Sequence, residues 1–203
     1  MPKDSKPRTK AECKILESAI LLFSRRGFGG TSVRDVARYA HVTPMTLYRG
    51  FKNKHDLIQE TLELVIKRHF DPSQFLMILY EHSARNPLGD LLLPALLRWY
   101  ASLPVPATKL LMNANLSDSA EWRGMAAGAI EKLTEVLTAF IDRELQKRPR
   151  NNIVARTAAH TLLMILLHMK ITSRETKSVR EEKKETAEVD TILRYCLIGL
   201  RER

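Results

Sequence analysis

The chain has 203 residues, of which 44% are hydrophobic, and this is enough for one substantial core or two small ones. Its 33 Lys and Arg residues outnumber its 23 Asp and Glu residues, which gives a formal net charge of +10. Its two cysteines, Cys13 and Cys196, offer neither a disulfide framework nor a C-x-x-C metal spacing. Its most apolar run, residues 158–171, is too short and too polar to span a bilayer. We therefore expect a soluble protein of a reducing cytoplasm, with no secretory signal and no membrane partner.

Residues 1–8 form a basic, proline-containing arm that should be disordered without a partner. Two interpretations of this arm stay open: a solvated terminus without function, or a source of further phosphate or minor-groove contacts. After the arm, apolar residues at helical spacing predict a first helix from about Thr9 to Arg26, with Gly27 as its C-cap. We expect this helix to support the elements that follow it.

The stretch 31–54 has the pattern of two short helices joined by a tight turn. Thr31 is the expected N-cap of the first helix, and the second begins with Thr43 as N-cap and Pro44 at the first helical position. A second helix that turns Leu47 toward the core turns its other side chains outward or onto its flanks. This arrangement is the helix-turn-helix, whose second helix lies in the major groove of DNA.

An ordinary helical hairpin inside an all-α protein is the alternative interpretation of this stretch. The distribution of charge favours DNA binding. Residues 1–54 carry 12 basic and 4 acidic side chains, or +8, whereas residues 55–203 carry 21 basic and 19 acidic ones, or +2. A basic domain attached to a nearly neutral one is typical of proteins that bind phosphates.

The next predicted helix is capped by Asn53 and ends near Phe70, before Asp71-Pro72, where we place a domain boundary. Beyond that point the chain shows no sustained strand alternation. Helices are predicted over roughly 72–85, 88–102, 107–115, 118–147, 152–172 and 187–202, and the charged stretch 173–186 is predicted to be a mobile loop or a frayed helix.

From Ile15 to Leu62 the chain resembles the TetR family of bacterial transcription regulators, through ILESAILLFSRRGFGGTSVRDVA, then VT, then TLYRGFKNKHDLI. It departs from the family pattern at His41, where the family usually has Gly in the turn, and at Gly50, where it usually has His or Tyr. The resemblance implies an all-α fold with an N-terminal three-helix helix-turn-helix domain and a larger C-terminal helical domain. The expected division is a basic arm at 1–8, a DNA-binding domain at 9–70, and an effector-binding and dimerisation domain at 71–203.

Helix geometry and the resemblance together predict the residues that contact double-stranded operator DNA. Those expected to face the major groove are Thr43, Pro44, Met45, Thr46 and Arg49. Arg34, on the preceding helix, resembles a family residue that contacts DNA. The residues that resemble the phosphate contacts of the family are Thr31, Tyr48 and Lys54.

Two further surfaces are expected in the C-terminal domain. Helices 152–172 and 187–202 would pair across a two-fold axis as a four-helix bundle, as in the resembled family, through Leu162, Leu166, Ile192, Leu193, Cys196, Leu197 and Leu200. The alternative is that both apolar stripes pack within the monomer. A pocket for a mostly apolar or aromatic effector would be lined by Trp99, Tyr100, Asn115, Trp122, Met125, His160 and Met164, which could instead simply pack in the core.

No enzymatic signature stands out. The histidines form no H-E-x-x-H or other ligand spacing, the serines lack a G-x-S-x-G context, and no glycine-rich phosphate loop occurs, so we expect neither a metal nor a cofactor. The preferred interpretation is a homodimeric DNA-binding transcriptional regulator, a repressor released from its operator by a small apolar or aromatic ligand. The alternatives are a regulator of the same fold without an effector and an all-α enzyme with an incidental basic N-terminus.

Overall fold

Helices make up nearly all of the structure, which confirms the predicted all-α fold. The computed structural model describes residues 8–80, 88–145, 152–174 and 178–201. Within those ranges it contains ten helices and no strand. The helices are α1 (Lys10–Arg26), α2 (Val33–Tyr39), α3 (Pro44–Gly50), α4 (Lys54–His69), α5 (Pro72–Tyr80), α6 (Leu88–Ser102), α7 (Val105–Asn115), α8 (Ala120–Leu145), α9 (Asn152–Thr172) and α10 (Val179–Arg201).

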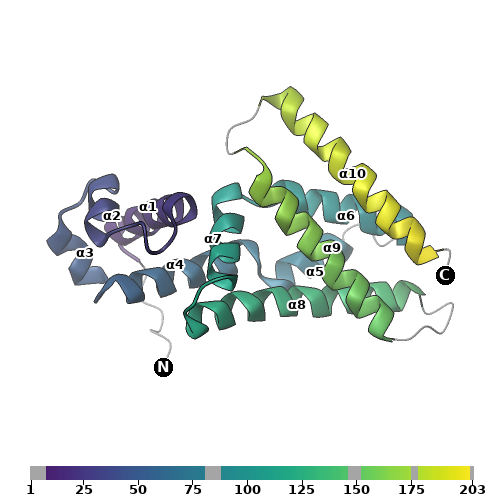
Figure 1. Ribbon diagram of the computed structural model, residues 1–203, viewed down its shortest axis with the longest axis horizontal. Coiled ribbons are helices and arrows are strands. Elements are labelled where there is room, and N and C mark those ends of the chain that lie inside the picture. The colour runs from purple at the N-terminus through teal and green to yellow at the C-terminus, as the bar shows by residue number, and fades with distance from the viewer. Residues whose placement is uncertain (1–7, 81–87, 146–151, 175–177, 202–203) are drawn as a thin grey trace.

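The first four helices gather at one end of the elongated molecule (Figure 1). Each contributes an apolar residue that is fully buried, namely Phe23, Val36, Leu47 and Leu57. Helix α1 packs against α2, α3 and α4, so the helix predicted to support the two short ones does so. An ion pair on the surface, Arg68 of α4 to Glu17 of α1 at 2.5 Å, joins the far end of α4 to the same helix.

The remaining helices form the rest of the molecule. Helix α8 runs along its length and packs against α9, and α10 lies over α6 and α9 (Figure 1). Helix α7 stands between the two groups, because it packs against α1 and α4 on one side and against α8 and α9 on the other. The buried apolar residues form one continuous cluster from α1 to α10, so the two ends of the molecule are joined by a shared core.

One predicted boundary is wrong. The charged stretch 173–186 was expected to be a loop or a frayed helix, but α10 already begins at Val179. Ser178 caps it: its hydroxyl accepts a hydrogen bond from the Glu181 backbone N–H at 3.3 Å, and the Glu181 carboxylate accepts one from the Ser178 N–H at 2.8 Å. This reciprocal capping box satisfies the backbone N–H groups of Ser178 and Glu181, which would otherwise hydrogen-bond only to water in this charged stretch.

Candidate nucleic-acid interface

The start of α2 is fixed by Ser32 and not by Thr31, so the predicted N-cap is wrong by one residue. The Ser32 hydroxyl accepts from the Asp35 N–H at 3.1 Å, and the Asp35 carboxylate accepts from the Ser32 N–H at 3.1 Å. The hydrogen bonds from Ser32 lower the pKa of the Asp35 carboxyl below its ordinary value. A carboxylate at the third helical position completes a capping box, which favours Ser32 over its neighbour.

Thr31 lies in the core instead. Its side chain is fully buried, and its hydroxyl donates to the backbone oxygens of Gly27 at 3.0 Å and Leu22 at 3.3 Å. The expected phosphate contact through this side chain is therefore wrong, because the hydroxyl is enclosed by the end of α1. Through these hydrogen bonds, Thr31 holds the α1–α2 connection against the C-terminal end of α1.

The turn between α2 and α3 is a Schellman motif centred on His41. The His41 N–H donates to the Arg38 oxygen at 3.2 Å, and the Val42 N–H donates to the Ala37 oxygen at 3.0 Å. This pattern needs a left-handed residue at the first position after the cap. His41 has a φ of +54°, the only positive φ outside glycine in the described residues. The glycine usual in the resembled family suits this conformation, and the histidine occupies it with backbone strain.

Helix α3 begins as the sequence predicted. The Thr43 hydroxyl accepts a hydrogen bond from the Thr46 N–H at 3.2 Å, and Pro44 occupies the first helical position. Leu47 and, after the helix, Phe51 are buried in the core. The opposite side of α3 is therefore turned toward solvent.

Large side chains on that outer side are unusually open. Met45 is 79% exposed and Tyr48 is 51% exposed, and Arg49 is exposed beside them. On α2, Arg34 is exposed and so is Tyr39, at 46%, which the sequence interpretation did not select. This end of the molecule therefore presents exposed aromatic and methionine side chains beside arginines.

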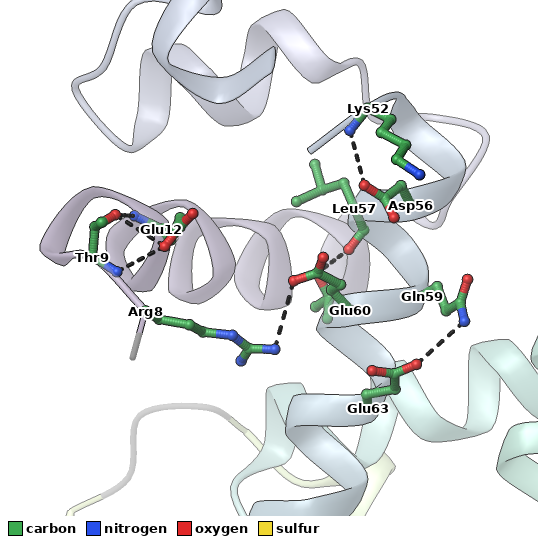
Figure 2. A network of polar contacts seen from close by, with 10 residues as sticks. Arg8, Thr9, Glu12, Lys52, Asp56, Leu57, Gln59, Glu60 and Glu63 are labelled. Atoms are coloured by element: carbon green, nitrogen blue, oxygen red, sulfur yellow. Dashed lines mark hydrogen bonds and ion pairs between the residues drawn. The ribbon is translucent and has the colours of Figure 1, made fainter. Parts of the chain in front are cut away.

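The start of α4 brings more basic residues to this end of the molecule. Asn53 caps the helix by accepting from the Asp56 N–H at 2.8 Å. The Asp56 carboxylate accepts from the Lys52 N–H at 2.8 Å (Figure 2). Lys54 is the first helical residue and is partly buried, whereas Lys52 is exposed. The capping bonds fix the backbone on which both lysines stand.

Gly50, the second departure from the family pattern, lies against the first turn of α1. A Cβ atom at this position would meet Glu12 Cγ at 3.2 Å and Glu12 Oε1 at 3.3 Å. The Glu12 carboxylate is held there because it accepts the backbone N–H of Thr9 at 2.7 Å, in the capping box of α1 (Figure 2). The larger side chains usual in the family would therefore require Glu12 to move.

The basic arm itself, residues 1–7, lies outside the described residues. Arg8, which follows it, pairs with Glu60 of α4 at 3.6 Å (Figure 2). Glu60 lies about one helical turn after Asp56, so this ion pair attaches the end of the arm close to the start of α4. Contact between the arm and DNA stays a prediction.

The residues expected to line an effector pocket differ in their burial. Trp99 and Tyr100 are each only 2% exposed and lie in the core of α6. The Trp99 ring packs on Phe75 with centroids 4.9 Å apart. The Tyr100 hydroxyl donates to Glu185, and burial, with a smaller contribution from the charge of Glu188, raises the pKa of Tyr100 to about 12.

The other members of that set lie elsewhere. His160 is exposed on α9, and its place in a pocket stays a prediction. Trp122 packs against the rings of Phe28 and His55, at the junction of α8 with the first four helices. The three remaining residues, all partly buried, are Asn115, Met125 and Met164.

The expected dimer residues also divide. Leu162, Leu166 and Leu193 are at most 2% exposed in the single chain, so they pack within it, as the alternative interpretation held. Ile192 is 38% exposed and Cys196 is partly exposed, while the side chains of Leu197 and Leu200 lie outside the described part. Tyr195, which the sequence interpretation missed, is 74% exposed on the same helix.

Metal sites and membrane spans are both absent from the part of the chain that the structure describes. No three His, Cys, Asp or Glu side chains in the described ranges gather closely enough to hold a metal ion. In the same ranges, no helix combines the length and the apolar character needed to cross a membrane.

Known proteins resemble this chain both locally and along its length. The family model for "Bacterial regulatory proteins, tetR family" matches residues 15–61. The "Probable HTH-type transcriptional regulator YttP" of Bacillus subtilis is 46% identical over 46 residues, which are 23% of this chain and 22% of that protein. The HTH-type transcriptional repressor BepR of Brucella suis is 27% identical over 173 residues, or 80% of each protein.

A solved structure extends the similarity to the whole fold. The transcriptional regulator FadR from Bacillus subtilis, crystallised with stearoyl-CoA, superposes with a TM-score of 0.63 over 91% of this chain and 96% of that one, at 17% identity. The match to YttP spans about a fifth of that relative, so it concerns the helix-turn-helix end alone. These similar proteins are transcription regulators and not enzymes, which sets the enzyme alternative aside.

Proposed function

Because the chain belongs to the tetR family of bacterial regulatory proteins, we propose that it is a homodimeric transcriptional repressor, released from its operator DNA by a small apolar or aromatic molecule. In this proposal α3 reads the operator, α9 and α10 join two copies, and residues 71–203 form the domain that takes the effector. The observation that carries the proposal is the exposed outer side of α3.

Each side chain on that outer side suits one part of B-DNA. Arg49 has the planar donors that pair with the N7 and O6 acceptors of guanine, and the Met45 side chain suits the methyl group of thymine. Tyr48 and Lys54 suit phosphates, because one has a hydroxyl donor and the other a charge at the N-terminus of α4. Arg34 would add a contact from α2.

The residues at the start of α3 complete the proposed DNA surface. Thr43 and Pro44 are exposed there, and Thr46 is partly exposed. The Thr43 hydroxyl accepts a backbone hydrogen bond and lies 3.0 Å from the Thr46 hydroxyl, so it can donate to DNA when Thr46 is the donor between the two. Thr31 is no longer included, because its hydroxyl donates within the fold.

A single copy of α3 is too short to select a site alone. The helix has seven residues, so a specific complex needs two copies bound to half-sites about 34–36 Å apart, or a multiple of that distance. We propose that the two copies pair through the outer sides of α9 and α10. Ile192 and Tyr195 are the apolar side chains that α10 leaves open for such contacts.

The effector is the least constrained part of the proposal. A mostly apolar ligand fits a helical domain whose interior is lined by aliphatic and methionine side chains, and the similar FadR structure contains stearoyl-CoA. Asn115, Met125 and Met164 remain as candidate lining residues. A regulator of the same fold without an effector is the alternative, and it predicts that no added apolar compound changes DNA affinity.

The test is selection of DNA by the purified protein. Duplexes recovered from a random pool should converge on a palindrome, and the logarithm of their binding constant should fall linearly with the logarithm of salt concentration. Recovery of unrelated sequences, bound no more tightly than the starting pool, would refute DNA recognition by α3. Displacement of the selected duplex by compounds from an apolar library would then separate the proposal from the alternative without an effector.

A further inference from the structure

We infer that Trp122, near the start of α8, is a positioning residue for DNA binding: its indole fixes the start of α4, and with it Lys54, relative to the C-terminal helices. The inference rests on the proposed function. Trp122 itself makes no DNA contact. From the C-terminal domain it controls a phosphate contact made by the other end of the molecule.

The indole packs against two rings from different parts of the DNA-binding end. The Phe28 ring, in the connection between α1 and α2, is 5.0 Å away between centroids, and the His55 ring, in the first turn of α4, is 5.1 Å away. Phe28 in turn packs edge-on against Phe23 of α1 at 5.6 Å. Trp122 therefore touches both segments that lead into the proposed DNA surface.

A polar contact reinforces the same junction. His55 Nε2 and Glu121 Oε2 are 2.8 Å apart, so the residue before Trp122 also holds the start of α4. A second link comes from α7, where the Asn113 side-chain amide donates to the Phe23 backbone oxygen at 3.4 Å. These ring contacts and two polar contacts therefore add to the apolar core that joins the DNA-binding end to the C-terminal helices.

The position of His55 explains why this junction matters for DNA. His55 directly follows Lys54 in α4, so a shift of the His55 backbone moves the backbone of Lys54 with it. The capping bonds of Asn53 and Asp56 make this first turn a rigid unit. If this first turn of α4 shifts as a unit, Lys54 and the backbone N–H groups of the turn move away from a bound phosphate together.

The chemistry of Trp122 indicates that ring area is what the junction requires. Its indole N–H is enclosed and has no hydrogen-bond partner among the described residues. An enclosed donor without a partner is unfavourable, and an aliphatic side chain would avoid that cost. A broad flat side chain can contact both the Phe28 and the His55 ring, and such aromatic pairs are favourable beyond their buried area.

The experiment measures the salt dependence of binding to a fluorescently labelled 40-base-pair duplex of random sequence, by anisotropy, for the full-length protein. Replacing Lys54 with Ala should reduce the slope of log K against log salt by about 0.9 for each phosphate that is no longer neutralised, or about 1.8 for a dimer. Trp122→Leu should reduce the slope by a similar amount. The double variant should show no further reduction, because both changes abolish the same interaction with the phosphate.

Matched variants separate positioning from general stability. Phe140, fully buried near the other end of α8, packs against Tyr80 of α5, so Phe140→Leu should destabilise the fold and keep the wild-type slope. Trp122→Phe keeps a ring against the two others and should restore most of the slope. His55→Ala removes one of the two ring contacts at a half-exposed position, where folding should survive, and should reduce the slope as Trp122→Leu does.

The outcomes are distinct. A wild-type slope for both Trp122→Leu and His55→Ala would overturn the inference and leave the proposed function intact. So would a double variant whose slope falls by the sum of the single effects, since the two residues would then act separately. If the wild-type protein itself showed no salt-dependent binding to the duplex, the proposed function and the inference would both fail.

Discussion

Replacing His41 with Gly should stabilise the protein. His41 holds a φ of +54° in the turn between α2 and α3, and the left-handed conformation costs a residue with a Cβ atom roughly 1–2 kcal/mol. Glycine avoids that strain, but its greater conformational entropy in the unfolded chain lowers the free energy of unfolding by about 0.4–1 kcal/mol. The difference spans about 0–1.6 kcal/mol, and its centre is a net stabilisation of about 0.8 kcal/mol. The side chain is exposed, so its removal leaves no cavity.

The measurement is thermal and urea unfolding of the two proteins at matched concentration. For a chain of this size, a gain of about 0.8 kcal/mol corresponds to a rise in Tm of roughly 2–3 °C. The control is His41→Ala, which removes the imidazole and keeps the strained backbone, so it should give no gain. Equal stabilisation by Ala and Gly would refute the explanation from backbone strain, and so would a lower Tm for the Gly variant.

Three other predictions concern the caps and surfaces of the same molecule. Ser32→Ala should destabilise by about 1 kcal/mol in urea unfolding, because it removes the N-cap of α2; an unchanged midpoint would contradict the capping assignment. Arg49→Ala should reduce the base preference at one position of the selected duplexes, whereas Lys54→Ala should weaken binding to all of these duplexes alike. The reverse pattern would mean that Lys54 contacts a base and Arg49 a phosphate. Replacing Ile192 and Tyr195 with Glu should give monomers in sedimentation, and a persistent dimer would place the interface elsewhere.

The outer face of α3 could be predicted because it depends on local spacing. Once Leu47 and Phe51 are assigned to the core, helical geometry leaves Met45 and Arg49 on the outer side. The same holds for Thr43 as N-cap, since the proline that follows it restricts where the helix can begin. These features need only a few neighbouring residues, all of them visible in the sequence.

The cap of α2 was harder, because two adjacent hydroxyl residues could each serve. Two interactions decide which hydroxyl caps the helix. Asp35 completes the capping box of Ser32, and the Leu22 carbonyl oxygen, nine residues before Thr31, accepts a hydrogen bond from the Thr31 hydroxyl. The first signal was present in the sequence and could have been used. The second arises only when the end of α1 folds back against the connection.

Trp122 could not be placed from spacing at all. Its helical position correctly indicated a side chain turned toward other residues, but its contacts, Phe28 and His55, lie 94 and 67 positions earlier in the chain. The start of α10 failed for a different reason. The capping box of Ser178 and Glu181 was visible, and the high density of charge around it wrongly outweighed that local signal.

The contact between Glu12 and Gly50 limits how operator specificity can be exchanged between relatives. A chimera that receives only α3 from a protein with His or Tyr at the position of Gly50 would place that side chain against Glu12 Cγ and Oε1, where even a Cβ atom has only 3.2–3.3 Å. The recipient must then shift the Glu12 side chain, which also serves the capping box at Thr9, or tilt the transplanted helix away from its intended base pairs. The smallest exchangeable unit in this protein is therefore α3 together with the first turn of α1, two segments that lie well apart in the gene.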